Sequence, residues 1–312
     1  MSTKPGTIVI GTRGSALARW QAGEVARLLR AATPALEISE KIIVTAGDRA
    51  QAGPGTLIDG KGAWVEEIES ALASGEVDVA VHSLKDVPAE LRAGLAIVAV
   101  PTRADPRDAI VSRSGLGLAA LPAGSRVGTS SLRRVCQLRA LRTDLEIDIL
   151  RGNVDTRLRK VAAGVVDAGV LACAGLDRLG FSERIAERID PGQMLPAIGQ
   201  GALALEARAA DGRVVALCRP LADPAAEATV AAERALLAGL GVGCRTPVAG
   251  HATLAGARLT LVGLVGRPDA SEMIRETVSG APAEAREIGA ELARRLIARG
   301  AGKILRELEG TG

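Results

Sequence analysis

The sequence contains almost no aromatic residues. Among its 312 residues are one Phe, two Trp and no Tyr, although 47% of the residues are hydrophobic. The cores must therefore be built from Ala, Val, Leu and Ile, and the flat side chains on which nucleic acid bases stack are nearly absent. A chain of this length is too long for one small core and is expected to form about two or three domains.

An excess of charge of one sign is also lacking. The 39 basic residues are almost balanced by 36 acidic ones, so the net charge is +3. Proteins that coat nucleic acid carry a larger basic excess, and no nucleic acid partner is expected. Local basic clusters within a nearly neutral chain suit a small acidic ligand better.

Paired cysteines, a targeting segment and long apolar runs are missing as well. The four cysteines are far apart and show no CxxC or Cys/His zinc spacing, which argues against a disulfide framework or a structural metal. The N-terminus has no basic segment followed by a long apolar one, and no apolar run is long enough to span a bilayer. We therefore expect a cytoplasmic monomer with no membrane partner and no metal.

Arginines gather beside helix-opening hydroxyls in the stretch RVGTSSLRR, which begins at Arg126. A short apolar run ends in this stretch, and a helix is predicted to follow it. Unpaired amides and the positive end of a helix dipole favour a carboxylate or phosphate, to which guanidinium groups add bidentate bonds. This first corner offers Thr129, Ser130 and Ser131 as donors and Arg133 and Arg134 as cations.

A second corner of the same kind follows directly. Residues 145–150 are predicted to form a strand, Arg151 and Gly152 a tight turn, and Asn153 the cap of a helix that carries Arg157. At the carboxyl edge of a parallel sheet, such residues lie where open α/β folds bind ligands. Arginines on an amphipathic helix often form only a solvated face, and this alternative stays open for both corners.

A third corner stands near the N-terminus, where Arg13 follows an apolar strand and Ser15 is a natural helix N-cap. A structural salt bridge is the alternative reading of Arg13. Residues 46–62, dense in Gly, Ala, Asp and Pro, are predicted to form a loop over a site. Part of this loop is similar to a phosphate-binding P-loop, but Gly62 replaces the Ser or Thr that holds magnesium, so nucleotide binding is not expected.

The sequence VHSLKDVP supplies a candidate for catalysis. A strand is predicted over residues 77–82, so Ser83, Lys85 and Asp86 follow its carboxyl end, where a proline stops further regular structure. A carboxylate at Asp86, in a cleft lined by arginines, would stay ionised and could stabilise a cation or exchange a proton. A surface ion pair between Lys85 and Asp86 is the alternative, and His82 is predicted to be a packed core residue.

Cys244 differs from the other cysteines because glycines flank it in the tight loop GVGCRTP. Exposure beside a cation lowers the pKa of a thiol and permits covalent attachment. Most lone cysteines are instead buried as small apolar residues, which is the expectation for Cys136, Cys173 and Cys218.

The order of predicted elements indicates lobes that the chain enters more than once. A linker with prolines at 101 and 106 leaves the first lobe, and the strand within 197–208 is predicted to return to the first sheet. Two crossings between two lobes are typical of a hinged clamp. A helix from Asp223, three strands and a helix over 282–299 then suggest a small α+β domain. The predicted domains are 1–101 with 202–219, 106–196, and 224–312.

The motifs GTRGSALARWQ, VHSLKDVP, VGTSSLRR, RGNVDTR, PAIGQGAL and GVGCRTPV, in this order and spacing, closely resemble those of the porphobilinogen deaminase family over nearly the whole chain. The resemblance implies an α/β fold of two periplasmic-binding-protein-like (type II) lobes with a double crossover and a small C-terminal α+β domain. It also implies a transferase of tetrapyrrole biosynthesis. Its partners would be porphobilinogen and a growing oligopyrrole chain, joined head to tail with loss of ammonia into hydroxymethylbilane.

The same resemblance implies roles for individual residues. A dipyrromethane cofactor would be held as a thioether on Cys244, and Asp86 would be the catalytic carboxylate that stabilises the cationic azafulvene left by ammonia. Every pyrrole brings an acetate and a propionate, which an arginine-lined cleft suits. The cofactor would contact Ser83, Lys85, Thr129, Ser130, Ser131, Arg133, Arg134, Gly152 and Arg157, and the substrate Arg13, Ser15, Lys61, Trp64, Arg151, Arg178 and Gln200.

Some positions depart from the family pattern. Trp64 stands where relatives usually have Phe, and Leu57 where some carry a base, which leaves Lys61 as the main cation of its loop. A non-catalytic solute-binding module with the same lobes is the main rival, and it predicts no role for Cys244. An RNA-binding protein is a second rival, which predicts strongly salt-dependent binding to polyanions.

Overall fold

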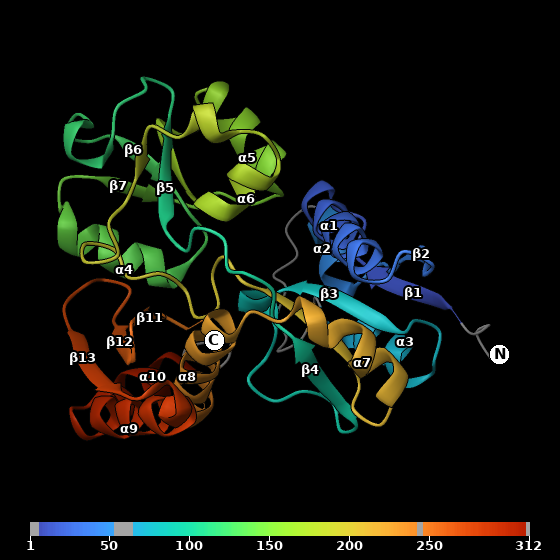
Figure 1. The fold of residues 1–312 in the computed structure, drawn as a ribbon. Helices are drawn as coiled ribbons and strands as arrows, with labels where there is room; N and C mark the ends of the chain where they lie inside the picture. The colour runs from blue at the N-terminus through green and yellow to red at the C-terminus, as the bar shows by residue number, and fades with distance from the viewer. Residues whose placement is uncertain (1–5, 53–64, 242–245, 310–312) are drawn as a thin grey trace. The chain divides into compact units, whose positions relative to one another are not determined.

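The structure, a computed structural model, describes residues 6–52, 65–241 and 246–309 (Figure 1). The chain divides into two compact units, one made of 1–103 with 202–227 and the other of 104–201 with 228–312. The predicted departure from the first lobe and the return to it are therefore both found. Within the described ranges, no helix combines the length and the hydropathy that crossing a bilayer requires.

The first unit contains a five-stranded sheet with the strand order β2-β1-β3-β10-β4. β1 pairs in parallel with β2 and β3, while β10 runs antiparallel to β3 and β4. The segment after the second crossing thus returns to the first sheet, as predicted. The strands are β1 Thr7–Thr12, β2 Glu37–Ile42, β3 Val79–Ser83, β4 Leu95–Ala99 and β10 Leu203–Arg208.

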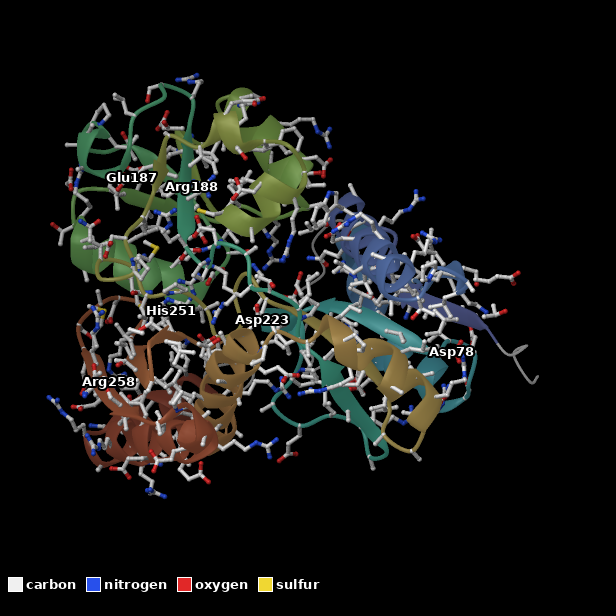
Figure 2. All side chains as sticks on the ribbon, in the orientation of Figure 1. Asp78, Glu187, Arg188, Asp223, His251 and Arg258 are labelled. Carbon is white, nitrogen blue, oxygen red and sulfur yellow. The ribbon has the colours of Figure 1, made fainter. Side chains whose placement is uncertain are left out.

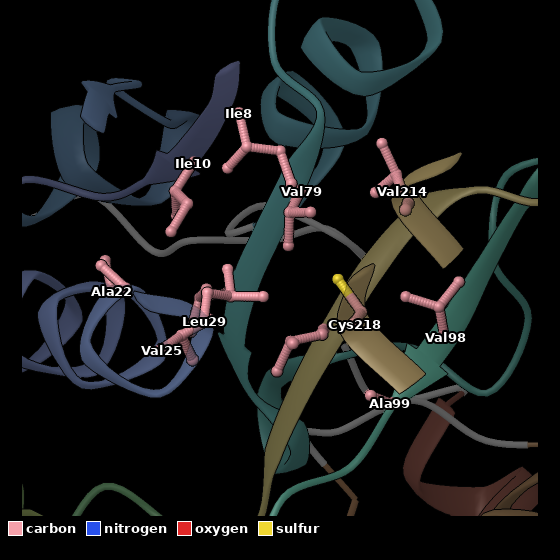
Figure 3. Close-up of a cluster of buried hydrophobic side chains, with 14 of the residues drawn as sticks. Ile8, Ile10, Ala22, Val25, Leu29, Val79, Val98, Ala99, Val214 and Cys218 are labelled. Atoms are coloured by element: carbon pink, nitrogen blue, oxygen red, sulfur yellow. The ribbon is translucent and has the colours of Figure 1, made fainter. Parts of the chain in front are cut away.

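An aliphatic core joins this sheet to its helices, as the composition requires. Ile8 and Ile10 of β1 pack with Val25 and Leu29 of α1, and Cys218 of α7 belongs to the same buried cluster (Figure 3). The helices of the unit are α1 Ala16–Ala32, α2 Ala46–Ala52, α3 Glu66–Ala73 and α7 Gly212–Cys218.

Residues 46–52 form α2, whereas the sequence predicted an irregular loop over 46–62. The reason is a reciprocal cap, in which the Asp48 amide donates to Thr45 Oγ1 and the Thr45 amide donates to Asp48 Oδ2, each at 3.2 Å. The remainder of the predicted loop, with Lys61 and Trp64, lies outside the described residues.

The second unit contains a five-stranded sheet with the order β7-β6-β8-β5-β9. β6 pairs in parallel with β7 and β8, and β5 is antiparallel to β8 and β9. The two α/β sheets therefore share one plan, a parallel core extended by an antiparallel strand, and the predicted fold class is confirmed. The elements are β5 Asp108–Ser112, β6 Arg126–Gly128, β7 Glu146–Asp148, β8 Ala168–Ala172, β9 Glu187–Arg188, α4 Leu132–Leu141, α5 Val154–Ala162 and α6 Cys173–Arg178.

A three-stranded antiparallel sheet, β11-β12-β13, completes the second unit. Cys136 of α4 packs with Ala249 of β11 and Leu264 of β12, so apolar contact joins the two sheets of this unit. The predicted terminal helix ends at Gly300 (φ +106°), after which a further helix begins that the sequence did not predict. The elements are α8 Pro224–Leu240, β11 Val248–Ala255, β12 Arg258–Gly266, β13 Met273–Gly280, α9 Ala285–Ala298 and α10 Ala301–Glu309.

Candidate active site

The turn after β3 exposes Asp86, while the apolar residues Leu84 and Val87 beside it are buried. A single 3-10 turn, η1 Leu84–Asp86, follows the strand. Leu84, its first residue, is 2% exposed, and Val87, the residue after it, is 1% exposed. The Leu84 amide donates to the carbonyl of Ala202 at 3.0 Å, which ties the turn to the start of β10. Asp86 itself is exposed, and its carboxylate has no hydrogen bond or ion pair with any described residue, Lys85 included.

Two polar pairs support β3, one buried and one partly buried. His82 Nε2 lies 3.0 Å from Glu206 Oε2, and both side chains are buried. Gln21 Nε2 donates to Ser83 Oγ at 2.8 Å. His82 is buried, as predicted, but its acidic partner was missed. The signal was present, because Glu206 interrupts the apolar strand LALEAR and a buried acid needs a partner.

Arg13 forms the ion pair that was the alternative to ligand binding. Its Nη2 lies 2.5 Å from Asp48 Oδ1, and its Nε lies 3.2 Å from each carboxylate oxygen. Burial alone would raise the pKa of the Asp48 carboxyl, but hydrogen bonds and charge from Arg13 outweigh it and lower that pKa. Ser15 caps α1 by accepting from the Ala18 amide. The ligand roles of Arg13 and Ser15 stay predictions.

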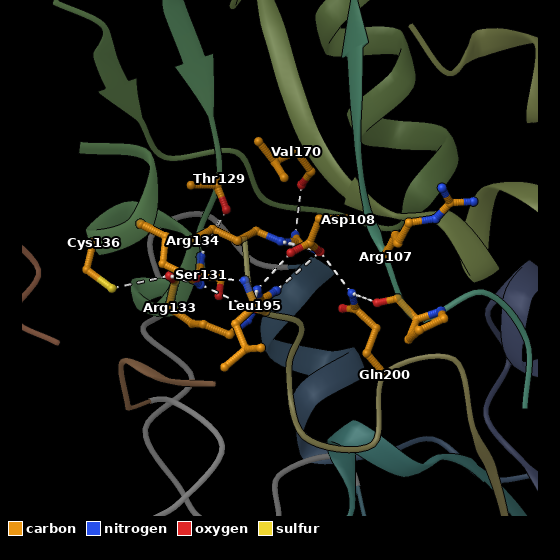
Figure 4. A network of polar contacts seen from close by, with 12 residues as sticks. Arg107, Asp108, Thr129, Ser131, Arg133, Arg134, Cys136, Val170, Leu195 and Gln200 are labelled. Atoms are coloured by element: carbon orange, nitrogen blue, oxygen red, sulfur yellow. Dashed lines mark hydrogen bonds and ion pairs between the residues drawn. The ribbon is translucent and has the colours of Figure 1, made fainter. Parts of the chain in front are cut away.

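Arg133 and Arg134 bind an internal carboxylate that sequence reasoning missed (Figure 4). Asp108, at 0% exposure, lies 2.7 Å from Arg133 Nη1 and 2.7 Å from Arg134 Nη2, and Gln200 Nε2 donates to it at 2.9 Å. Burial opposes the charged carboxylate, yet the two guanidinium groups hold the pKa of Asp108 far below its usual range. The two arginines are 3% and 5% exposed, so the open cationic face predicted here is mostly used internally.

One hydrogen-bond donor of this cluster is nevertheless not used by any described residue. Arg133 Nε is buried and has no hydrogen-bond partner among the described residues. Two guanidinium groups against one carboxylate also leave the cluster of Asp108, Arg133 and Arg134 with a net charge of +1. A buried excess cation with an unused donor is stabilised by one further anion.

The hydroxyls at the start of α4 lie next to this cluster in sequence. Of the three hydroxyl residues predicted to offer N-cap oxygens, Ser131 occupies the N-cap position of α4, but its side chain makes no capping bond. Thr129 Oγ1 accepts from the Ser131 amide at 3.2 Å and is buried, whereas Ser130 is exposed. The first turn of the helix therefore presents hydroxyls at the end of its dipole that favours anions.

The second corner is built around a glycine. Gly152 has φ +118°, and a Cβ there would lie 2.7 Å from Thr156, so this turn requires glycine. Arg157 Nε donates to the Gly152 carbonyl at 2.7 Å, and Lys160 Nζ donates to the Arg151 carbonyl. These bonds shape the turn, while the Arg151 residue is exposed.

Arg178 and Gln200, predicted to bind substrate, both contact the crossing segments. Arg178 Nη2 donates to the Gly201 carbonyl at 2.7 Å, and Gln200 Nε2 donates to the Pro106 carbonyl at 2.7 Å. The Ala104 amide also donates to the Gly201 carbonyl at 3.2 Å, and a Cβ on Gly201 would clash with the Ala104 carbonyl oxygen, which leaves no room for a side chain. Arg188 (labelled in Figure 2) adds ion pairs to Asp177 and Asp105.

Three cysteines are inert by their surroundings. Cys136, Cys173 and Cys218 are buried, which confirms the expectation for them. Burial raises the pKa of the Cys136 thiol to about 11 and those of Cys173 and Cys218 to about 12, so these thiols are protonated at neutral pH. Cys244 lies outside the described residues. Within the described ranges, no group of His, Cys, Asp and Glu is suited to hold a metal ion.

Comparison with known proteins gives matches over almost the entire chain. Residues 8–216 match the family model "Porphobilinogen deaminase, dipyromethane cofactor binding domain", and residues 227–298 match "Porphobilinogen deaminase, C-terminal domain". Porphobilinogen deaminase of Syntrophobacter fumaroxidans is 50% identical over 301 residues, which are 96% of this chain and 97% of the relative. That of Roseiflexus castenholzii is 49% identical over 299 residues, 96% of this chain and 98% of the relative.

A solved structure with a related arrangement is the VFT2 domain of Bordetella pertussis BvgS. It covers 69% of this chain and 85% of its own, with 18% identity and a TM-score of 0.41. A likeness of that size adds nothing to the strand order already described.

Proposed function

The chain belongs to the porphobilinogen deaminase family, whose enzymes polymerise porphobilinogen head to tail into hydroxymethylbilane, and we propose which of its residues carry out that reaction. The observation that carries the assignment is the environment of Asp86. It is a carboxylate on a turn anchored by buried neighbours, with no described partner of its own. The hydrogen-bond acceptors of such a carboxylate are available to a ligand.

Asp86 is proposed as the catalytic residue. When the C–N bond of the protonated aminomethyl group of porphobilinogen breaks, neutral ammonia departs and the positive charge stays on the pyrrole as an azafulvene cation. A carboxylate held beside this cation lowers the barrier because the attraction is strongest in the transition state. The tie between Leu84 and Ala202, with the buried pair of His82 and Glu206, keeps the turn in place. A fixed turn avoids the cost of ordering the carboxylate during the reaction.

The residues at the start of α4 fit the dipyrromethane that the family model names. The buried cluster of Asp108, Arg133 and Arg134 has a net charge of +1 and an unused donor at Arg133 Nε. The hydroxyls of Ser130 and Ser131 add donors at a helix end that favours anions. We therefore propose that these residues hold acidic side groups of the cofactor, which when bound supplies the pyrrole carbon from which the chain grows.

Cys244 is proposed as the site of covalent attachment. The other three cysteines are buried with raised pKa values, so none of them presents a thiolate at neutral pH. In the sequence, Cys244 is preceded by Gly243 and followed by a cation, Arg245. Elimination and sequence context thus agree on the same residue.

Intact mass and thiol counting test this attachment on the purified protein. A thioether on Cys244 gives a mass above that of the chain by one dipyrromethane, and three rather than four thiols after denaturation. Cys244→Ser should lose the added mass and still show three thiols. Cys218→Ala, the matched control, should keep the added mass and show two. A wild-type protein with four free thiols and no added mass would contradict the proposal.

Arginines are proposed to bind the carboxylates of porphobilinogen and the growing chain. Arg151 is the most exposed of these candidates. Arg13, Arg157 and Arg178 are proposed to contribute as well, although each also has an internal bond. We further propose that the enzyme consists of the three predicted domains and acts as a cytoplasmic monomer without nucleic acid or membrane partners. Light scattering of the purified protein, and binding to RNA and lipid vesicles, would test the last two points.

A further inference from the structure

Arg13 is a candidate substrate-binding cation that forms an ion pair with a carboxylate of its own chain. Asp48 contacts it through two oxygens and two nitrogens, at 2.5 and 3.2 Å. This is the planar, bidentate geometry that a carboxylate of the substrate would also adopt on a guanidinium group. The two ligands would therefore compete for the same donors.

Asp48 is built so that it can release Arg13. Its Oδ2 also accepts from Thr45 Oγ1 at 2.8 Å and from the Thr45 amide at 3.2 Å. Thr45 is fully buried and fixed. A carboxylate that keeps two donors after losing a third partner is not left unsatisfied, which limits the cost of the exchange.

Partial exposure makes the exchange feasible as well. The side chains of Arg13 and Asp48 are 18% and 22% exposed, so solvent and solutes reach the pair. By contrast, the carboxylate of Asp108 is fully buried behind its arginines and has no such access. A partly exposed ion pair contributes little to folding stability and can be replaced by another ion pair of similar strength.

We propose that Asp48 is a specificity-determining residue, an internal carboxylate that occupies Arg13 until a carboxylate of the substrate displaces it. This inference rests on the proposed role of Arg13 in substrate binding. An intramolecular competitor acts at a high effective concentration, so it raises the KM of every ligand that uses Arg13. It also orients the guanidinium group before the ligand arrives. Neutral ligands cannot replace Asp48, because they offer no charge to the arginine.

Steady-state kinetics of the holoenzyme test the exchange. Asp48→Asn keeps an oxygen for Thr45 but loses the charge that attracts Arg13. It should lower the KM for porphobilinogen by roughly two- to fivefold with little change in kcat, because a partly exposed ion pair is worth at most about 1 kcal/mol. Asp48→Glu should restore a KM close to wild type. Glu67→Gln is the matched control. It removes a carboxylate of α3 that pairs with Arg49, a residue of the same helix as Asp48, and it should leave the KM unchanged.

The direction of the change separates the alternatives. If Asp48 only holds Arg13 in place, Asp48→Asn raises the KM, and this result would overturn the exchange. An unchanged KM would overturn it too. Arg13→Gln reports on the underlying assignment: a raised KM in this variant with no decrease in Asp48→Asn refutes the exchange alone. An unchanged KM in Arg13→Gln refutes both the exchange and the substrate role of Arg13.

Discussion

Two aspartates at strand ends, one in each unit, have opposite surroundings. Asp86 follows β3, is exposed and has no described partner. Asp108 opens β5, is fully buried and is bound by two arginines and a glutamine. The same residue type is therefore a structural charge in the second unit and, in the role proposed above, a reacting group in the first. Burial among donors, rather than position at a strand end, decides between the two roles.

The sharpest test of this difference is Asp86→Asn. We expect kcat to fall by roughly 10²- to 10⁴-fold, because the carboxylate is proposed to act on the reacting atoms. The melting temperature should not change, since the side chain makes no bond with any residue that the structure describes. Kinetics and calorimetry of the same preparation measure both. Wild-type turnover in this variant would remove Asp86 from its proposed role.

Asp108→Asn should show the reverse pattern. Removing one partner of a buried ion cluster leaves two guanidinium groups without their counter-charge, which costs about 3–5 kcal/mol of folding free energy. Urea unfolding measures this loss. Asp144→Asn is the matched control, because Asp144 pairs with Arg142 at 41% exposure and this substitution should cost much less folding free energy than Asp108→Asn. Equal losses in the two variants would show that the burial of Asp108 carries no special weight.

Acid should also lower the folding stability through Asp108. The pKa of Asp108 in the folded chain lies below its ordinary value of 3.8, so the folded state binds its proton less readily than the unfolded state. The stability from Asp108 is therefore complete above pH 3.8 and is lost as the pH falls further below it. Hydrogen exchange of β5 amides should accelerate over that range in the wild type, and this pH dependence should be weaker in Asp108→Asn. An identical pH dependence in both would exclude Asp108 as its source.

Arginines extend the comparison at a smaller scale. Arg151→Gln should raise the KM by about tenfold or more, the usual worth of a bond to a charged group, without loss of stability. Arg142→Gln should lower the stability and leave the KM unchanged, because Arg142 donates to the carbonyls of Leu118 and Leu121 and pairs with Asp144. An Arg151 variant that loses stability at constant KM would assign Arg151 to the fold instead.

The smallest effect is expected at Arg159. It pairs with Asp155 one helical turn away at 3.4 Å, and both side chains are at least half exposed. Arg159→Gln should change the folding free energy by about 0.5 kcal/mol or less and leave the kinetics unaltered. A clear loss of activity here would show that arginines outside the proposed site also bind the substrate chain.

Much of the fold was readable from the sequence because apolar periodicity and caps are local signals. The N-cap at Ser15, the helix from Pro224 to Leu240 and the return of β10 to the first sheet were all predicted. Helix α2 was missed because its cap depends on the pairing of Thr45 with Asp48, inside a stretch rich in residues typical of loops. Helix α10 was missed because Gly300 ends one helix and directly precedes the next.

The sequence supplied candidate residues for the site, which stay predictions, but it did not indicate the partners of these residues in the fold. Motif order gave the residues, and the family match agrees with that resemblance. Sequence could not show that Asp108 binds Arg133 and Arg134, because a contact over 25 residues depends on how β5 and α4 pack. For the same reason, the partner of His82, 124 residues away, was not foreseen. Long-range charge pairing is a property of the folded chain.

The cluster of one carboxylate and two guanidinium groups constrains how this sequence can change over time. A neutral replacement at 108 leaves two confined cations, and a neutral replacement at 133 or 134 removes donors that also hold the carbonyls of Leu195 and Val170. Single substitutions in this triplet are therefore expected to lower stability, whereas compensated exchanges preserve the charge. Among relatives, positions 108, 133 and 134 are therefore expected to change together rather than one at a time.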